Sequence, residues 1–339
     1  MVDIGKGRVL VTGGAGFIGS ALVWALNQRG IEDIVVSDFL GESEKWRNLV
    51  PLRYADYLEA DDLLALVEED AGRLRGITTV LHMGACSATT ERDAAYLVRN
   101  NFEYTKALAT WSLSRGIRFV YASSAATYGD GVQGMSDEAD LETLRPLNMY
   151  GYSKQMFDQW ARRQGVLYRI VGLKYFNVFG PNEDHKGDMK SLVHKAYHQV
   201  LETGAIRLFK SYRPEYAHGE QKRDFVYVKD AVAMSLHLAE TDRAGGLYNI
   251  GTGRAGTWNE LARSVFAALE KPERIEYIEM PDALRGKYQY YTQAEVKRLA
   301  AAGWAKPAMS LRDSVVDYVR GYLVPDARLG DGANERRTS

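Results

Sequence analysis

The chain has 339 residues, of which 46% are hydrophobic, so it can bury one large core or two domains that share an interface. Its 43 lysines and arginines nearly balance 44 aspartates and glutamates, which gives no electrostatic case for a nucleic-acid or anionic-membrane partner. The single cysteine, Cys86, excludes an intrachain disulfide and suits a reducing compartment. No apolar run approaches the ~20 residues of a membrane span and the start lacks a charged leader, so we expect a cytoplasmic protein.

A glycine-rich turn follows the first predicted strand, residues 8–11, and precedes a helical pattern over residues 21–28. In this turn Gly13 permits a tight bend, Gly16 lets the backbone approach a pyrophosphate, and Gly19 allows close helix packing. The amino end of the helix favours the phosphate charge. This order predicts a dinucleotide site, although an isolated glycine pattern of this kind also occurs in ordinary loops.

The second predicted strand, residues 34–37, ends at Asp38, at the spacing of about 20 residues expected for a ribose contact. An acidic side chain there can accept from a free 2′-hydroxyl, which favours NAD. Lys45 and Arg47 lie near enough in sequence to pair with a 2′-phosphate, which favours NADP. The residues leave both cofactors open.

A buried strand over residues 79–82 opens into a loop of small residues, 83–90, after an amphipathic helix over residues 61–73. Such loops line the ligand crevice at the carboxyl ends of parallel strands. We interpret His82, within the apolar strand, as a packed and hydrogen-bonded residue rather than a base. We interpret Cys86 as a packing residue rather than a nucleophile, because it has no basic neighbour in sequence.

One long helix is predicted over residues 93–114, and the strand after it, residues 117–122, runs into Ser123 and Ser124. These hydroxyls can cap the next turn. A hydroxyl at this crevice edge can also hydrogen-bond a reacting alkoxide or carbonyl.

Tyr150 and Lys154 follow at a four-residue spacing, which on a helix places the phenol and the ammonium on one face. A free phenol titrates near pH ~10, so nearby positive charge is needed before it exchanges protons at neutrality. Lys154 and an oxidised nicotinamide would supply that charge. The pair predicts proton transfer coupled to hydride transfer.

Further along, a buried strand is expected over residues 168–173, other strands over 225–228, 247–251 and 275–280, and helices over 191–201, 295–301 and 310–322. A polar insertion, residues 181–190, marks the start of a smaller lobe. We expect a Rossmann-type, doubly wound α/β fold with an interleaved substrate lobe. Residues 1–175, joined by 224–254, form the dinucleotide-binding domain, 176–223 and 255–325 form mainly the substrate lobe, and 326–339 form a flexible tail.

Several motifs agree in order with one known family. They are GACSATTE (84–91), SSAATY (123–128), YFNVFGP (175–181), HKG (185–187), RDFVY (223–227), YQ (288–289) and YTQA (291–294). With the glycine turn and the Tyr/Lys pair, they make the chain resemble the extended short-chain dehydrogenases/reductases, in the nucleotide-sugar branch. More narrowly it is similar to the ADP-L-glycero-D-manno-heptose 6-epimerases, over residues 7 to about 322.

The resemblance implies an epimerase that inverts C6″ of an ADP-linked heptose by transient oxidation, supplying heptose to the lipopolysaccharide core. Hydride must return to the opposite face of the carbonyl, so each orientation needs its own acid/base. The family implies Tyr150 and Lys186 for these roles, with Lys154 lowering the tyrosine pKa and Ser124 binding the reacting oxygen. It also implies NADP, although NAD remains possible because Ala60 stands where a cofactor-contacting lysine is usual.

We expect no metal site. The expected cofactor-binding residues are Gly13, Gly16, Phe17, Ile18, Gly19, Asp38, Phe39, Lys45, Met83, Gly84, Ala85, Cys86, Ser87, Asn100, Lys154, Val178 and Lys186. The expected substrate-binding residues are Ser124, Asn177, Asp188, Lys195, Phe209, Lys210, Ser211, Arg223 and Tyr288. Arg223 can clasp a diphosphate or pair with Asp224 or Asp230.

Two rival functions use the same fold. One is another nucleotide-sugar enzyme, such as a 4-epimerase or a 4,6-dehydratase. The dehydratase is disfavoured because Ala125 and Ala126 stand where such enzymes place an Asp-Glu pair. The other is a cofactor-sensing protein without turnover, which is disfavoured because both Tyr150 and Lys154 are present. The family also implies a homo-oligomer, a pentamer.

Overall fold

The computed structural model describes residues 3–69, 71–285 and 288–332. Its centre is one sheet of seven strands in the order β11-β6-β5-β4-β1-β2-β3, with every neighbouring pair parallel. The strands are β1 (Arg8–Thr12), β2 (Ile34–Asp38), β3 (Asp56–Glu59), β4 (Ile77–His82), β5 (Arg118–Ser124), β6 (Val171–Tyr175) and β11 (Gly246–Ile250). Strands β2 and β3 lie on one side of β1, and the later strands β4, β5, β6 and β11 lie on the other. This is the doubly wound arrangement that the sequence predicted.

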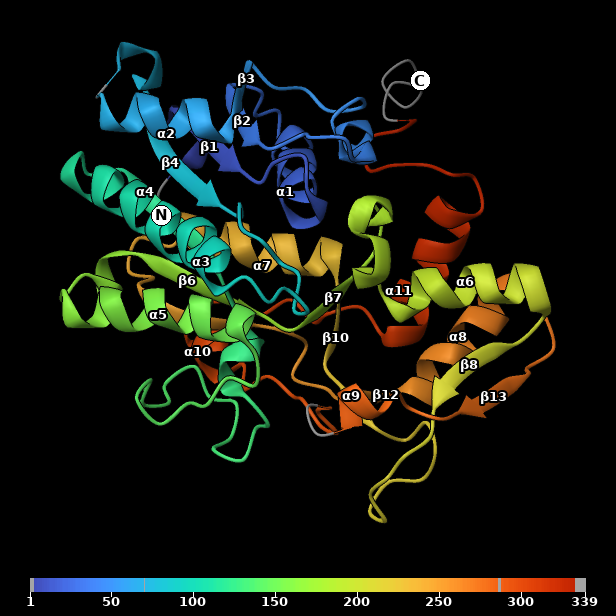
Figure 1. Cartoon of the computed structure of the whole chain (residues 1–339). Helices are drawn as coiled ribbons and strands as arrows, with labels where there is room; N and C mark the ends of the chain where they lie inside the picture. The colour runs from blue at the N-terminus through green and yellow to red at the C-terminus, as the bar shows by residue number, and fades with distance from the viewer. Residues whose placement is uncertain (1–2, 70, 286–287, 333–339) are drawn as a thin grey trace.

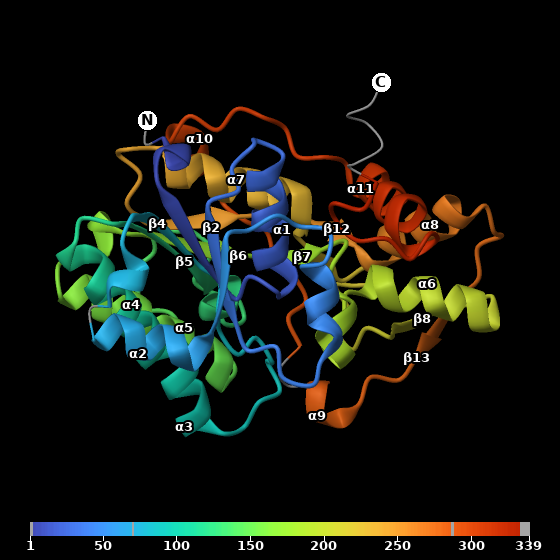
Figure 2. The same ribbon diagram turned by 90° about the horizontal axis from the view of Figure 1, so that it is seen from above.

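Helices cover both faces of this sheet (Figure 2). On one face lie α1 (Phe17–Asn27) and α7 (Val228–Glu240), and on the other lie α2 (Ala60–Glu68), α4 (Tyr104–Ser114) and α5 (Met149–Arg163). Because both faces are covered, the central strands are continuously apolar: Val9, Leu10 and Val11 of β1 are fully buried. Among the described residues, no helix is both long and apolar enough to cross a membrane.

Most of the remaining elements pack beside the sheet toward its carboxyl edge, whereas α10 (Lys297–Ala301) packs against the start of β11 (Figure 1). The other helices are α3 (Ala94–Leu97), α6 (Leu192–Thr203), α8 (Trp258–Leu269), α9 (Asp282–Arg285) and α11 (Leu311–Tyr318). Three short strand pairs are β7 (Asn177–Phe179) with β10 (Phe225–Tyr227), β8 (Ile206–Phe209) with β13 (Ile275–Ile278), and β9 (Lys222–Arg223) with β12 (Gly256–Thr257). Between β10 and α8 the chain returns to the large sheet as β11, beside β6.

Short helices complete the chain. They are the 3-10 helices η1 (Ile4–Lys6), η2 (Glu44–Asn48), η3 (Gly72–Leu74), η5 (Ala125–Tyr128), η6 (Leu167–Arg169) and η7 (Asp184–Met189), and the π-helices η4 (Val98–Glu103) and η8 (Val319–Leu323).

Predicted and observed elements differ in several places. The helix predicted over residues 61–73 is α2, which ends at Glu68, followed by the 3-10 helix η3. The helix over 93–114 contains the π-helical segment η4, which carries Asn100 and Asn101. The strand expected at Tyr168 begins later, because Tyr168 lies in η6 and its side chain is 72% exposed. The edge strand β3 was not predicted.

The C-terminal segment also differs from the expectation of a flexible tail from residue 326. Leu329 is fully buried in the hydrophobic core that includes α1. The backbone at Gly330 approaches Pro51 so closely that a Cβ there would lie 3.1 Å from the Pro51 side chain. The prediction is therefore wrong for Leu329 and its neighbours, whereas residues 333–339 lie outside the described residues.

Candidate active site

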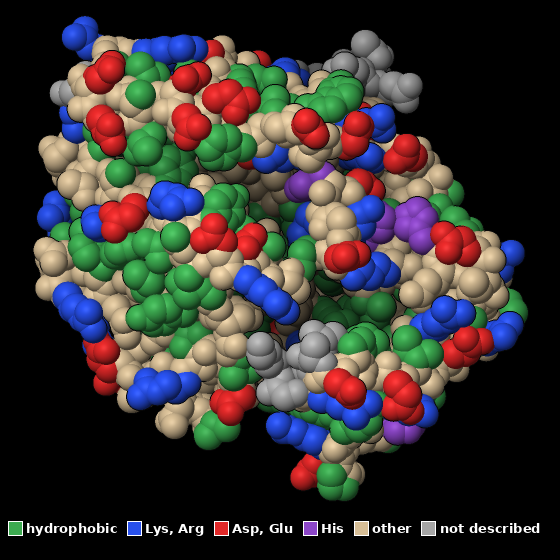
Figure 3. Space-filling view, viewed as in Figure 1, with side chains coloured by type: hydrophobic (Ala, Val, Ile, Leu, Met, Phe, Trp, Pro, Cys, Tyr) green, Lys and Arg blue, Asp and Glu red, His purple; other side chains and the backbone are tan. Residues whose placement is uncertain are grey.

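One cleft of about 790 Å³ lies at the carboxyl ends of β1, β2, β4, β5 and β6. Figure 3 shows the molecule hollowed between the half that carries the large sheet and the half that carries α6 and α8, with lysine and arginine side chains along the hollow. The predicted site residues that line the cleft are Gly13, Gly16, Phe17, Ile18, Gly19, Asp38, Phe39, Lys45, Met83, Gly84, Ala85, Cys86, Ser87, Asn100, Ser124, Tyr150, Lys154, Asn177, Val178 and Lys186. The structure therefore brings together the four predicted catalytic residues and all the predicted cofactor-binding residues.

Asp38, at the end of β2, binds the glycine turn. Its Oδ2 accepts from the backbone N–H groups of Ala15 (2.9 Å) and Gly16 (3.1 Å). Its Oδ1 accepts from the Phe39 N–H and from Lys45 Nζ, both at 2.7 Å. The carboxylate thus shapes the turn and also holds Lys45 at the cleft.

The glycine turn leaves a bare backbone surface at the start of α1. A Cβ on Gly19 would lie 2.0 Å from the Gly13 carbonyl oxygen, so only glycine lets the helix pack this closely on the turn. Gly16 is the N-cap, and no side chain caps this end of α1. The free N–H groups and the helix dipole suit the pyrophosphate of a dinucleotide, so these residues fit a nicotinamide cofactor.

Tyr150 and Lys154 both lie on α5. This helix begins where the Asn148 side chain accepts from the Gly151 N–H at 2.8 Å. Tyr150 and Lys154 then project from one face into the cleft, as their spacing predicted. Lys154 Nζ donates to the Ala122 carbonyl of β5 at 2.9 Å, which fixes the ammonium at the sheet edge.

Burial shifts the pKa values of both Tyr150 and Lys154. It raises the pKa of Tyr150 above its ordinary value, and a hydrogen bond with the Ser124 side chain opposes the rise. Burial lowers the pKa of Lys154 to about 8, while the Asp158 charge opposes this shift. The structure does not show the expected lowering of the tyrosine pKa by Lys154, so the phenol is protonated at neutral pH until further positive charge reaches it.

Ser124 caps a turn and also lies at the cleft. Its Oγ accepts from the Ala126 N–H at 3.1 Å, so the hydroxyl does cap the turn after β5. The same hydroxyl lines the cleft beside Tyr150.

Lys186 reaches the same cleft from η7. The loop is closed at its base by Glu183, whose carboxylate accepts from the backbone N–H and the hydroxyl of Ser191, both at 2.6 Å. Lys186 Nζ lies 4.9 Å from the centroid of the Phe17 ring, at the start of α1. Burial lowers the pKa of this lysine, which favours an amine that can exchange a proton.

A buried polar network that the sequence analysis did not predict lies beside the cleft edge of the sheet. Lys174 of β6 and Asp158 of α5 are 1% and 0% exposed, and their charges pair at 3.0 Å. Asp158 also accepts from the Tyr121 and Ser123 hydroxyls, both at 2.8 Å, and Lys174 donates to Thr127 Oγ1 at 2.6 Å. The network joins α5 to the ends of β5 and β6, one helical turn beyond Lys154.

Comparisons with known proteins agree with this geometry. A sequence model of the "NAD dependent epimerase/dehydratase family" matches residues 9–251. The chain belongs to this family. Curated relatives include the ADP-L-glycero-D-manno-heptose-6-epimerases of Nitratidesulfovibrio vulgaris strain DP4, 53% identical over 93% of this chain and 97% of the relative, and of Fusobacterium nucleatum, 46% identical over 94% and 98%.

Solved structures of the epimerase family share the fold. The ADP-L-glycero-D-manno-heptose-6-epimerase of Helicobacter pylori superposes with a TM-score of 0.79 at 26% identity, covering 94% of this chain and 96% of the other. The UDP-glucose 4-epimerase of Thermus thermophilus, solved as a complex with NAD, gives 0.74 at 28% identity, covering 93% and 99%. The predicted resemblance to the epimerase family is therefore confirmed.

Within this epimerase-family site, part of the predicted substrate set does not line the cleft. These residues are Asp188, Lys195, Phe209, Lys210, Ser211, Arg223 and Tyr288. Lys195 Nζ instead donates to the Asp188 carbonyl at 2.6 Å, and Lys210 pairs with Glu279 at 2.6 Å. The ammonium groups of Lys195 and Lys210 therefore bind partners outside the cleft lining. The spacing of residues in the sequence does not reveal such partners.

Arg223 lies one layer behind the cleft. Its guanidinium lies over the Tyr288 ring at 5.1 Å and the Trp258 ring at 5.6 Å, and Trp258 lines the cleft. The predicted alternative of an ion pair with Asp224 is not found, because Asp224 accepts from Thr252 at 2.7 Å and from nearby backbone N–H groups.

The cleft has further lining residues that the sequence analysis did not assign. They include Tyr104, His185, Trp258, Gln289 and Thr292. His185, Gln289 and Thr292 lie inside the motifs that carried the resemblance, so those motifs could have indicated them. Tyr104 and Trp258 gave no such signal, because only tertiary packing brings them to the sheet edge.

His82 is a structural residue of this epimerase-family fold, as predicted. Its ring nitrogens bond Thr12 Oγ1 at 2.6 Å and Thr105 Oγ1 at 2.9 Å, and burial lowers its pKa to about 3. The unfolded chain binds a proton near pH ~6.5, so His82 supports folding fully above that pH and progressively less as the pH falls toward 3. We expect the free energy of unfolding to lose about 1.4 kcal/mol per pH unit over this range from His82. Urea titrations between pH 7 and pH 5 would measure it, and His82→Gln should flatten the slope.

Proposed function

We propose that this protein interconverts ADP-D-glycero-D-manno-heptose and ADP-L-glycero-D-manno-heptose. The observation that carries the proposal is that Tyr150 and Lys186, on elements far apart in sequence, line one cleft with the glycine turn. Relatives of 46–53% identity that bear the corresponding name are covered almost end to end. The reaction would supply heptose for lipopolysaccharide.

In this mechanism the glycine turn and Lys154 would hold an oxidised nicotinamide, which would supply hydride acceptance from C6″ and hydride return to the opposite face of the resulting ketone. Tyr150 and Lys186 each exchange the proton of the C6″ oxygen, one in each orientation of the intermediate. Ser124 hydrogen-bonds that oxygen, and Lys154 holds the cofactor ribose and adds positive charge beside the phenol. Because C6″ lies outside the sugar ring, rotation about C5″–C6″ exposes the second face without moving the whole sugar.

We further propose NADP as the cofactor. Lys45 lies at the cleft with its ammonium 2.7 Å from Asp38, where it can also pair with a 2′-phosphate. Arg47, the other candidate cation, does not line the cleft and pairs with Glu44. Ala60 lines the cleft without offering a charge, so discrimination would rest on Lys45.

Lys45→Ala is expected to weaken NADP binding at least ~10-fold, the lower end for a lost hydrogen bond to a charged group, and to change NAD binding little. Isothermal titration of both cofactors into protein freed of bound nucleotide would measure this. Arg47→Ala is the matched control and should leave both affinities unchanged. If Lys45→Ala weakens the binding of NAD and NADP by the same factor, the assignment of Lys45 to the 2′-phosphate is wrong.

Remaining aspects of the proposal follow the family. The protein would act in the cytoplasm as a homo-oligomer, a pentamer, which light scattering after gel filtration would test. Residues 1–175 with 224–254 would hold the cofactor, and residues 176–223 and 255–325 would bind the sugar nucleotide.

The function is tested by incubating the protein with the D-glycero isomer and following the C6″ proton by NMR. Inversion at C6″, with no net change in the bound cofactor, is the expected result. If bound cofactor is verified by mass spectrometry and C6″ keeps its configuration, the proposal is wrong. Inversion at C4″ of a UDP-sugar under the same conditions would instead identify a 4-epimerase.

A further inference from the structure

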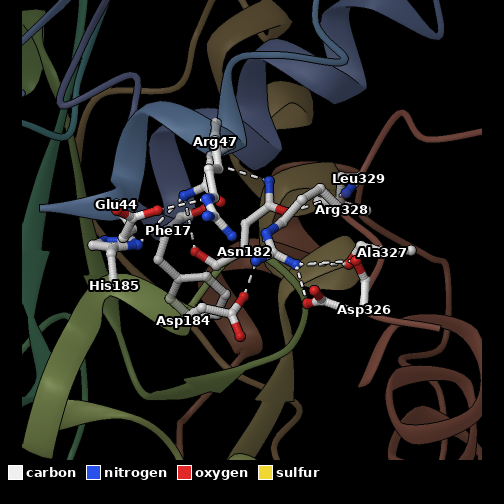
Figure 4. Close-up of polar contacts among 12 residues, drawn as sticks. Phe17, Glu44, Arg47, Asn182, Asp184, His185, Asp326, Ala327, Arg328 and Leu329 are labelled. Carbon is white, nitrogen blue, oxygen red and sulfur yellow. Dashed lines mark hydrogen bonds and ion pairs between the residues drawn. The ribbon is translucent and has the colours of Figure 1, made fainter. Parts of the chain in front are cut away.

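The loop that carries Lys186 is anchored at its start by Asn182. This residue is fully buried and has a left-handed backbone, with φ +76°. Its Nδ2 donates to Ser20 Oγ at 3.0 Å, its carbonyl accepts from Asn48 Nδ2 at 3.1 Å, and its Oδ1 accepts from the Leu329 N–H at 3.0 Å. Helix α1, the cofactor-side helix η2 and the C-terminal segment therefore all hydrogen-bond to one residue, Asn182 (Figure 4).

The C-terminal segment makes a second contact with this loop. Arg328 Nε lies 3.5 Å from Asp184 Oδ2, and the arginine side chain is only 12% exposed. Asp184 also accepts from His194 Nε2 at 3.0 Å. Burial alone would raise the pKa of Asp184, but His194 and then the Arg328 charge lower it below its ordinary value, so the carboxylate is ionised and held.

These contacts hold the loop just before Lys186, and none of them involves its ammonium. Asn182 and Asp184 precede it on the same short loop, and Figure 4 shows both bound to the chain that runs through Arg328 and Leu329. The ammonium lies over Phe17 of α1, the helix to which Asn182 is also bonded. A lysine ammonium sits at the end of a flexible four-carbon chain, so its position depends on how firmly the backbone of that residue is held.

We propose that residues 326–331 are a strap that positions Lys186, with Arg328 and Leu329 as its positioning residues. The inference rests on the proposed function, in which Lys186 is the second acid/base. Leu329 secures the strap by burying its side chain in the core, and Arg328 and the Leu329 N–H bind the loop. The strap therefore couples the end of the chain to catalysis without reaching the substrate.

A double-mutant cycle in the full-length protein tests the strap. Arg328→Met is expected to lower kcat about 10-fold with KM little changed, less than the ~100-fold that a misplacement of 1 Å can cause. In a Lys186→Met background the same change should cost nothing further, because the group being positioned is gone. Leu329→Ala should behave alike. Arg320→Met is the control, since Arg320 pairs with Glu270 at 2.8 Å and is half exposed.

Hydrogen exchange gives a readout that does not depend on activity. The Lys186 and Lys190 N–H groups bond the Glu183 and Gly187 carbonyls at 3.0 and 3.3 Å. Both amides should exchange faster in Arg328→Met and stay unchanged in Arg320→Met. Unchanged exchange in Arg328→Met, or an equal loss of kcat with and without Lys186, would overturn the strap. A wild-type protein that does not epimerise would refute the proposed function instead, while the exchange result still judges the strap.

Discussion

Replacing Lys186 by methionine is expected to lower the rate of C6″ inversion at least ~100-fold, the lower range for loss of a general acid/base. Methionine keeps the length of the side chain and its packing over Phe17 but cannot transfer a proton. The free energy of unfolding should change little, and cofactor binding is measured separately because Lys186 is also an expected cofactor contact. The measurement is kcat by NMR, with the cofactor content checked by absorbance after denaturation.

A second substitution separates charge from proton transfer at this position. Lys186→Arg retains the positive charge, yet arginine does not deprotonate in proteins. Lys186→Arg should therefore lower kcat for C6″ inversion nearly as much as Lys186→Met does. Recovery of activity in Lys186→Arg would mean that the lysine acts only as a charge, and full activity in Lys186→Met would remove it from the mechanism.

Tyr150→Phe is expected to cause a loss of similar size, at least ~100-fold in kcat, because the hydroxyl that exchanges the proton is missing. The ring should still fill its place between Ser124 and the cleft, so the fold and the cofactor content should be retained. Tyr152→Phe is the matched control: it changes the same helix, but Tyr152 is 48% exposed and does not line the cleft.

Stopped-flow reduction of the cofactor distinguishes the two acid/bases. If each serves one orientation of the intermediate, one variant should oxidise the D-glycero isomer slowly and the other should oxidise the L-glycero isomer slowly. Equal defects toward both isomers in both variants would contradict the division of roles.

The cofactor side of the cleft could be predicted from the chain because its determinants are local. Gly13, Gly16 and Gly19 lie three residues apart in the turn between β1 and α1. Asp38 ends β2, which pairs with β1, so this one unit brings all four residues together. Tyr150 and Lys154 needed only one helical turn to share a face. All of them line the cleft.

The sugar side was harder because its residues come from separate elements. Arg223 and Tyr288 fell within recognisable motifs, yet neither lines the cleft, and Arg223 packs behind Trp258. Lys210, which lies outside those motifs, pairs with Glu279. No spacing rule predicts such a partner, since it depends on how α8 and the short strand pairs meet. The prediction of a flexible tail from residue 326 rested on its polar composition. It was wrong at Leu329 because the side chain of this one leucine is buried in the core.

The amino-acid sequence by itself determined the alternation of strands and helices, the glycine turn with its acidic partner, and the helical pair of tyrosine and lysine. These depend on contacts within one helix or within one consecutive strand–turn–helix–strand unit, so the local backbone geometry dictates them. Only the tertiary structure decided that Lys186 meets Tyr150 in one cleft, that Lys174 and Asp158 form a buried pair, and that Leu329 returns to the loop of Lys186. Each of those contacts joins distant parts of the chain, where burial and packing of the whole fold select the partner.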